Sequence, residues 1–145
     1  VNERQDIVYR EPPVPGIAVP APIAAPEQSA FSRTVQPGPV LLQRYSALTF
    51  NSHRIHFDRD YCLNDEGYPG LVVHGPLLAT LLLDLLRQQL PDANVTAFSF
   101  RALAPVFDLH AFSLHGEPDD SGRGFHLWVE RHDGALAMRA TATLA

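Results

Sequence analysis

The strongest hydrophobic pattern in the chain lies at residues 76–90, "PLLATLLLDLLRQQL", where leucines recur at helical spacing and the few polar residues fall on one stripe. Pro76 stands in the first turn and Pro91 follows the last, as is typical of helix ends. We therefore expect a helix over residues 76–90. Because this helix is apolar over most of its circumference, it should be buried on most sides, and a curved sheet wrapped around it would achieve this.

Downstream of this helix, short apolar stretches with period-two alternation predict four β-strands. They are expected within residues 94–106, 109–118, 124–134 and 136–145. The pair Asp133-Gly134 between the last two strands is a tight hairpin signal, and "EPDDSGRG" before the third strand is a longer hairpin loop. The pattern predicts an α+β domain in which a four-strand antiparallel meander follows the helix.

The part of the chain before the helix is less regular. Residues 40–50, "VLLQRYSALTF", are predicted as a short apolar strand that runs into a turn or helix. Eight of the 13 prolines fall between Pro12 and Pro39, so residues 11–37 are interpreted as an extended linker. Residues 1–10 predict a strand, which needs a partner. We infer that the chain is part of a longer one; a mobile tail is the alternative.

Composition and charge narrow the class of protein. A chain of 145 residues has room for one domain with a proper core. A net charge of −5 offers no basic field for nucleic acid, so we expect no such partner. The longest apolar run is too interrupted for a membrane span. The single cysteine, Cys62, cannot form an internal disulfide, and a soluble cytoplasmic protein is expected.

Residues 51–58, "NSHRIHFD", place an amide, two histidines, an arginine and a carboxylate close together. A metal site is one interpretation, since His53 and His56 form His-x-x-His and His74 lies downstream. No cysteine or spaced carboxylate completes a convincing ligand set, so we expect no metal and no cofactor. Acid–base chemistry is the other interpretation, because an ordinary histidine pKa of about 6.5 suits proton transfer near neutrality.

The stretch "YSALTFNSHRIHFDRDY…GYPGLVVHGPLLATLLLDLL", followed by "FSFRALAPVF", resembles the MaoC-like hydratases and dehydratases of the hot-dog fold. The signature of that family has an acid, an Asn-Pro pair and a histidine, and then His-Gly at the start of the central helix. The likeness covers residues 38–145. It is greatest to the double hot-dog branch, which includes mesaconyl-CoA (3-methylfumaryl-CoA) hydratases, itaconyl-CoA hydratases and mitochondrial 3-hydroxyacyl-thioester dehydratases.

This resemblance implies a domain organisation. Residues 38–145 would be a catalytic hot-dog domain, with an antiparallel sheet wrapped around a long central helix. Residues 1–10 would be the last strand of a preceding, degenerate hot-dog domain, and residues 11–37 the connector. The resemblance also implies an acyl-CoA substrate and no membrane partner. The domain would form a homodimer or pair with its own N-terminal hot-dog domain.

For the chemistry, the resemblance implies a hydro-lyase that adds or removes water across the double bond of an enoyl-CoA thioester. His56 takes the position of the acid–base histidine. Asn51 falls where the catalytic aspartate usually stands, and an amide can orient water but cannot accept its proton. Gly75 is expected to polarise the thioester carbonyl through its N–H group, at a helix start where the dipole favours negative charge.

Substrate binding is assigned to Arg54, His53, His74 and Tyr45. Arg54 replaces the proline of the signature; it binds a carboxylate of a short branched dicarboxylyl-CoA, binds a CoA phosphate, or is a surface residue. His53 could instead make hydrogen bonds at the turn, and Tyr45 could be core packing. Asp58 could orient His56 or cap the next turn, and the cap is favoured. His110, His115, His126 and His132 are expected to be surface or packing residues.

Two other functions remain open at this point. Asn51 in place of the usual acid is compatible with a non-catalytic hot-dog module that only binds acyl-CoA. A hot-dog acyl-CoA thioesterase would also use the helix N-terminus as an electrophile. The spacing of Asn51 and His56 ahead of His74-Gly75 favours hydration over hydrolysis.

Overall fold

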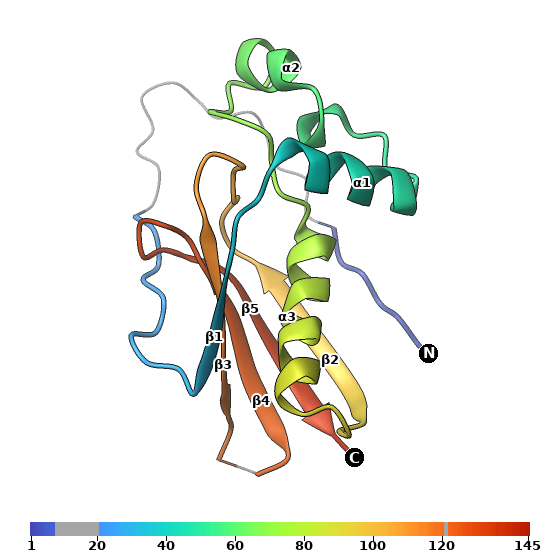
Figure 1. Cartoon of the computed structure of the whole chain (residues 1–145), viewed down its shortest axis with the longest axis vertical. Coiled ribbons are helices and arrows are strands. Elements are labelled where there is room, and N and C mark those ends of the chain that lie inside the picture. Colours follow the sequence, from blue (N-terminus) through green and yellow to red (C-terminus); the bar gives the residue numbers. More distant parts are fainter. Residues whose placement is uncertain (8–20, 121) are drawn as a thin grey trace.

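The computed structural model describes residues 1–7, 21–120 and 122–145 of the chain. Within them, a five-stranded antiparallel sheet in the order β1-β3-β4-β5-β2 curves around helix α3 (Figure 1). The strands are β1 (Phe31–Val35), β2 (Val95–Ala102), β3 (Phe112–Pro118), β4 (Gly124–Glu130) and β5 (Leu136–Leu144). The helical elements are α1 (Pro39–Thr49), η1 (Arg54–His56), α2 (Arg59–Asn64) and α3 (Gly75–Gln89).

Helix α3 confirms the helix predicted at residues 76–90. Pro76 lies in its first turn, and the backbone N–H of Leu90 donates to Leu86 O just before Pro91 ends the run. Its buried side chains meet apolar side chains from the inner face of the sheet. The helix contributes Leu77, Leu78, Ala79, Leu82, Leu85 and Leu86, and the sheet contributes Phe112, Leu114, Leu127, Val129 and Met138. The sheet therefore wraps the apolar face of the helix as predicted, while Thr80, Arg87, Gln88 and Gln89 on the rest of the helix are exposed.

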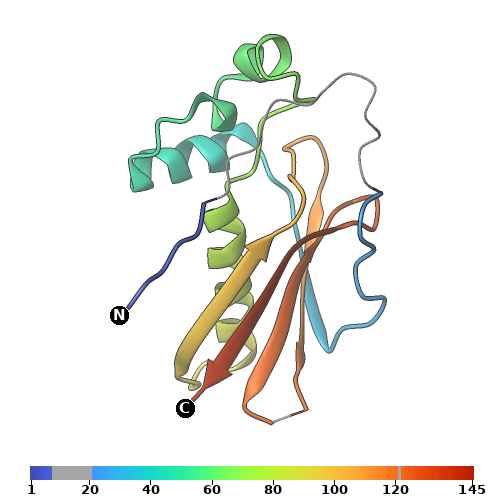
Figure 2. The same ribbon diagram turned by 180° about the vertical axis from the view of Figure 1, so that it is seen from behind.

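The order of the strands differs from the predicted four-strand meander. Strands β3, β4 and β5 do form a meander, and the hairpin at Asp133-Gly134 is confirmed by a φ of 77° at Gly134. Strand β2, however, pairs with β5 and not with β3 (Figure 2). The reason is that β1 already occupies the free side of β3, and the connection 103–111 is too long for a tight hairpin.

Strand β1 corrects the predicted linker at residues 11–37. Phe31–Val35 pairs along its whole length with β3, from Phe31 opposite Gly116 to Val35 opposite Phe112. This segment contains no proline and carries β-branched and aromatic residues, which favour strands. Its signal was hidden by the prolines on both sides. The sheet therefore begins before residue 38, while residues 11–20 of the linker lie outside the described residues.

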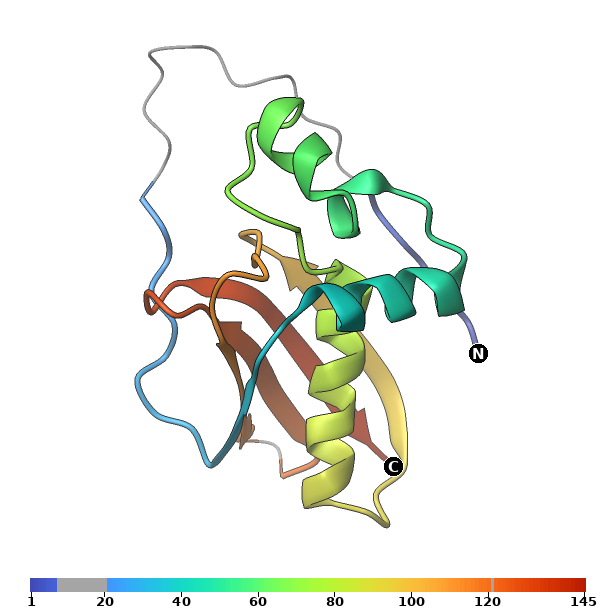
Figure 3. The ribbon, with the colours of Figure 1, turned by 45° about the horizontal axis from the view of Figure 1, so that its top comes forward.

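Residues 40–50, predicted to begin as a strand, belong instead to helix α1. Pro39 at the first helical position presets the backbone, and Leu42 and Ser46, one turn apart, form the buried side. The helix ends at Phe50, whose φ of 54° is left-handed. Helix α1 lies across the N-terminal end of α3 (Figure 3).

The strand predicted at residues 1–10 is only partly within the described residues. Residues 1–7 belong to no helix or strand, and residues 8–10 are not described. Pairing of this segment with a preceding domain therefore stays a prediction. Among the described residues, no helix has the length and apolar character needed to cross a bilayer.

A leucine of the central helix tests the packing. Leu82 is 0% exposed, so Leu82→Ala leaves a cavity and should lower the free energy of unfolding by about 2–5 kcal/mol. Leu48→Ala makes the same change at a side chain that is 80% exposed and should shift stability by less than about 0.5 kcal/mol. Chemical denaturation of both variants measures the difference, and equal losses would contradict the fold.

Candidate active site

Two buried histidines from different parts of the chain meet at the N-terminal end of α3. His56 ends η1, and His74 is the N-cap of α3. Their rings stack with centroids 3.6 Å apart and planes 17° from parallel. Both residues are buried, with 7% of His56 and 1% of His74 exposed. Charged imidazoles would repel each other at this separation, so the stack favours two neutral rings.

The backbone determines which nitrogen of His56 carries its proton. Nδ1 lies 2.7 Å from the carbonyl oxygen of Val72, and a carbonyl can only accept, so Nδ1 is the donor. In a neutral ring Nε2 then has a free lone pair. The N–H of Val72 donates in turn to Ile55 O at 2.9 Å, which fixes the two segments together. Burial is the main cause that lowers the pKa of His56; the bond to Val72 opposes it, and nearby His53 adds to it.

His74 is held by α1. Its Nε2 lies 2.9 Å from the hydroxyl oxygen of Ser46, which is itself buried, and the ring of Tyr45 packs edge-on at 4.8 Å. Burial, followed by the proximity of His56, lowers the pKa of His74 to about 4. His74 therefore stays neutral near pH 7. Its Nδ1 atom is buried and has no hydrogen-bond partner among the described residues.

The side chains of the 51–58 cluster separate into two groups. The side-chain Oδ1 of Asn51 accepts the backbone N–H of His53 at 3.0 Å. The backbone N–H of Asn51 donates to Ser46 O at 2.9 Å. The turn thus joins the end of α1 to η1. The ring of His53 lies edge-on to His56 with centroids 5.7 Å apart. The amide and both histidines therefore remain near one another.

Arg54 belongs to the second group. Its guanidinium binds Asp58 at 2.8 Å and lies over the ring of Tyr61 at 4.1 Å, with 56% of the side chain exposed. Asp58 also accepts the backbone N–H of Tyr61 at 3.0 Å and caps α2, which confirms the predicted capping role. Arg54 thus begins the same turn that His56 ends, but its side chain lies on the surface and binds Asp58.

A groove lies beside Gly75, and it is lined by Val72, whose carbonyl binds His56, but by none of His53, His56 and His74. Its volume is about 290 Å³. Gly75 is the first residue of α3, where backbone N–H groups lack partners within the helix, and a Cβ placed on it would meet nothing within 4 Å. Apolar side chains supply most of the walls. The lining residues are Val72, Val73, Gly75, Leu78, Ala102, Leu103, Ala104, Pro105 and Val106.

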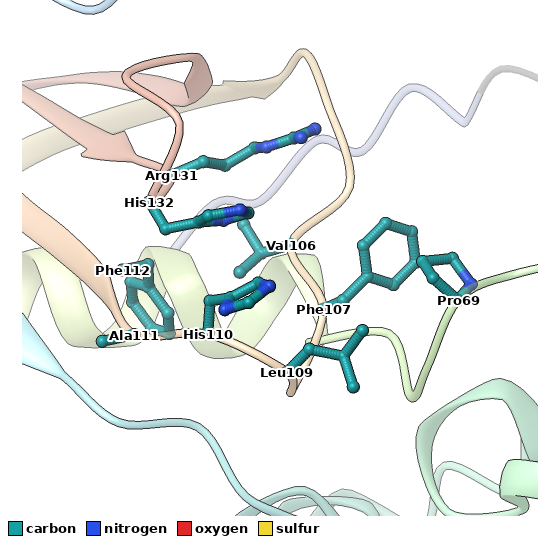
Figure 4. Close-up of a pocket in the computed structure, with 9 residues that line it drawn as sticks. All are labelled: Pro69, Val106, Phe107, Leu109, His110, Ala111, Phe112, Arg131 and His132. Carbon is teal, nitrogen blue, oxygen red and sulfur yellow. The ribbon is translucent and has the colours of Figure 1, made fainter.

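The other histidines lie away from this groove. His110 and His132 stack at 3.9 Å over a separate cavity of about 200 Å³ that shares Val106 with the groove (Figure 4). His115 packs against Trp128 and contacts Glu130 at 2.9 Å. Among the described residues, no group of three or more His, Cys, Asp or Glu side chains is placed to hold a metal ion.

Sequence reasoning missed two groups that shape the site. Ser46 holds His74, but a serine inside an apolar helical stretch carries no local signal for that contact. The carbonyl of Val72 fixes His56, and a backbone acceptor cannot be recognised from residue type. Both contacts join segments that are distant in sequence, so only the fold reveals them.

Comparisons with known proteins show the family to which the chain belongs. Residues 1–108 match the family model described as hydroxyacyl-thioester dehydratase type 2. The chain is 50% identical over 145 residues to mesaconyl-C(4)-CoA hydratase of Chloroflexus aurantiacus, covering 99% of this chain and 50% of that protein. It is 39% identical over 93 residues to the mitochondrial hydroxyacyl-thioester dehydratase type 2 of Schizosaccharomyces pombe, covering 63% of this chain and 31% of that protein. The chain thus spans half or less of the length of these relatives.

Solved structures share the fold. An (R)-hydratase from A. caviae involved in PHA biosynthesis superposes with a TM-score of 0.68 at 24% identity, covering 81% of this chain and 92% of that one. A MaoC-like dehydratase from Phytophthora capsici gives a TM-score of 0.70 at 18% identity, covering 90% of this chain and 47% of that one. At these identities the likeness concerns the fold, and it confirms the predicted α+β hot-dog architecture.

The low pKa of His74 predicts a pH dependence of stability. Between pH 6.5 and about 4 the unfolded chain binds a proton at His74 that the folded chain rejects, so stability falls as the pH falls. From pH 7 to pH 4 the wild type should lose about 3 kcal/mol more than His74→Gln, which cannot titrate. Denaturation at both pH values measures this, and parallel losses would show that His74 is not a buried neutral base.

Proposed function

Because this chain belongs to the hydroxyacyl-thioester dehydratase type 2 family, we propose that it hydrates enoyl-CoA thioesters or dehydrates their 3-hydroxyacyl counterparts. The observation that carries the proposal is the buried His56, whose Nδ1 is committed to Val72 O, so that Nε2 is the free base. The 50% identical relative named mesaconyl-C(4)-CoA hydratase supports a short branched dicarboxylyl-CoA as the substrate.

In the hydration direction, Nε2 of His56 takes a proton from water as the oxygen adds to the β-carbon. The electron pair of the double bond moves to the α-carbon and the thioester oxygen, giving an enolate-like species. The imidazolium of His56 then returns the proton to the α-carbon. A lowered pKa keeps His56 unprotonated at neutral pH, ready for the first step. Dehydration is the same sequence reversed.

Asn51 and Gly75 complete the proposed catalytic set. The Oδ1 atom of Asn51 is taken by the N–H of His53, which leaves its amide N–H groups to hold the water. Asn51 therefore orients water and leaves the proton to His56. The N–H of Gly75 stabilises the enolate oxygen at the start of α3, where the helix dipole adds to the effect. The apolar groove beside Gly75 would exclude water from the acyl chain and strengthen that hydrogen bond.

Substrate binding is proposed for His53, His74, Tyr45 and Arg54. His74 and Tyr45 form one wall of packed rings, and the ring of His53 lies edge-on to His56. Arg54 would read the second carboxylate of the substrate, exchanging or sharing its contact with Asp58. A surface arginine with no role in substrate binding would make the same contact with Asp58, and Arg54→Met distinguishes the two roles.

The proposed partner is a second hot-dog domain, either the chain's own N-terminal domain or a second copy. Strand β2 forms an outer edge of the sheet, and Phe100 on it is 47% exposed. Phe50 at the end of α1 is 95% exposed. Relatives about twice as long as this chain support the first arrangement, in which residues 1–10 are the last strand of that domain. We propose the cytoplasm as the compartment; the buried free thiol of Cys62 suits a reducing environment.

An assay of the purified protein with crotonyl-CoA, mesaconyl-CoA and itaconyl-CoA tests the reaction class. Loss of the conjugated thioester absorbance without release of free thiol is expected. Release of thiol would indicate a thioesterase, and neither change would indicate a binding module. His56→Ala should lower the rate by about 10²–10⁴-fold, because it removes the proton shuttle. His126→Ala, at an exposed histidine of β4, is the matched control, and full activity of His56→Ala would refute the mechanism.

Arg54→Met tests the choice of substrate. If Arg54 binds the second carboxylate, kcat/KM should fall by about tenfold or more on mesaconyl-CoA, a loss of roughly 1.4 kcal/mol, and much less on crotonyl-CoA, which lacks that carboxylate. Steady-state kinetics on the two substrates measure the ratio. Equal losses would assign Arg54 to CoA binding or to the surface contact with Asp58.

A further inference from the structure

Asp108 is a buried carboxylate that takes no part in the proposed chemistry. It lies in the connection between β2 and β3, and only 2% of its side chain is exposed. Oδ1 accepts the backbone N–H of Leu71 at 2.9 Å, and Oδ2 accepts from the guanidinium of Arg59 at 2.5 Å. Burying a charge is costly unless it is paired and hydrogen-bonded. A carboxylate placed here therefore needs both partners in position.

The backbone around Asp108 is joined to the segment that follows α2. The N–H of Asp108 donates to Leu71 O at 3.0 Å, and the N–H of Val73 donates to Val106 O at 2.8 Å. Together these bonds form a short antiparallel bridge at Val72 and Phe107. Asp108 thus fixes Leu71 through its backbone and through its side chain.

Packing leaves this arrangement little freedom. A Cβ on Gly70 would lie 2.8 Å from Oδ1 of Asp108 and 3.0 Å from Cγ of Leu109. Only glycine, which has no Cβ, allows the backbone at position 70 to lie this close to the Asp108 carboxylate. A shift of this strand would either break the hydrogen bonds of Asp108 or press on Leu109.

The clamped segment carries the carbonyl that orients His56. Val72, next to Leu71, accepts Nδ1–H of His56 at 2.7 Å and donates its own N–H to Ile55 O at 2.9 Å. On the other side, Arg59 begins α2 three residues after His56. Asp108 therefore holds both the acceptor of the histidine and the helix that follows the histidine.

We propose that Asp108, with Arg59, is a positioning residue that keeps the Val72 carbonyl against His56 and so holds His56 in its Nδ1–H tautomer. This inference rests on the proposed role of His56 as the base. It extends that role to a carboxylate that touches neither substrate nor histidine. Replacing a residue that orients a metal-ligating histidine through a hydrogen bond typically lowers activity by about 10–100-fold, and we expect the same range for Asp108.

Asp108→Asn is the main test, because the amide keeps the volume and the acceptor for Leu71 but loses the charge that binds Arg59. We expect kcat to fall by about 10–100-fold with KM nearly unchanged. The ¹⁵N signals of His56 should move from a single Nδ1–H tautomer toward a mixture. Asp133→Asn is the matched control: Asp133 also binds an arginine, Arg131, and a backbone N–H, but in the β4–β5 hairpin. It should leave kcat and the His56 tautomer unchanged.

If Asp108→Asn does not fold, Arg59→Lys gives the second measurement, since it keeps the charge and loses the planar pairing. A smaller fall in kcat with the same tautomer change is expected. A folded variant with an unchanged His56 tautomer would overturn the proposal, whether or not kcat falls, because Asp108 would then be structural only. The spectrum is independent of turnover, so failure of the proposed reaction, seen as full activity in His56→Ala, remains distinguishable.

Discussion

The packing of α3 against the curved sheet is the constraint on which the other features depend. The apolar face of the helix is buried against the sheet, and the backbone N–H and C=O groups of its middle turns bond within the helix. The N–H groups of the first turn and the C=O groups of the last turn have no partner within the helix. The two stacked histidines and Gly75 lie at the N-terminal end of the helix, and the apolar groove borders Gly75. The proposed chemistry uses this end because its free N–H groups and the helix dipole favour a developing negative charge.

Burial of His56 and His74 determines their protonation state. An imidazole in water would be partly charged near neutrality, but His56 and His74 stack out of contact with most solvent. A second neutral ring is a suitable wall for a base, since it excludes water without adding charge. Each ring is then oriented by a different fixed group, His56 by a backbone carbonyl and His74 by a helical hydroxyl. Burial favours the neutral form of both histidines, and the two hydrogen bonds fix the orientation of each ring.

Local patterns in the sequence allowed the long helix, four of the five strands and the Asp133-Gly134 turn to be predicted, because each depends on neighbours along the chain. The position of β2 was predicted incorrectly, since the choice between β3 and β5 as its partner depends on where β1 lies. Strand β1 itself was hidden among prolines. For the site, the resemblance to the MaoC-like proteins indicated His56 and Gly75. Contacts such as Ser46 with His74, or Asp108 with Leu71, have no local signature because they form only after distant segments have packed.

Strand β2 has a consequence for how the chain behaves in solution. Its sequence, "VTAFSFRA", combines strong strand propensity with a single charge and no proline, and one side of its backbone faces no other described strand. Segments of this composition at a sheet edge act as templates on which further strands assemble, in the manner of fibrils. A second hot-dog domain seated against β2 would then do more than complete a catalytic unit. It would cover the free edge of β2 and so prevent further strands from adding there. Assembly with that domain would therefore also protect the chain from aggregation.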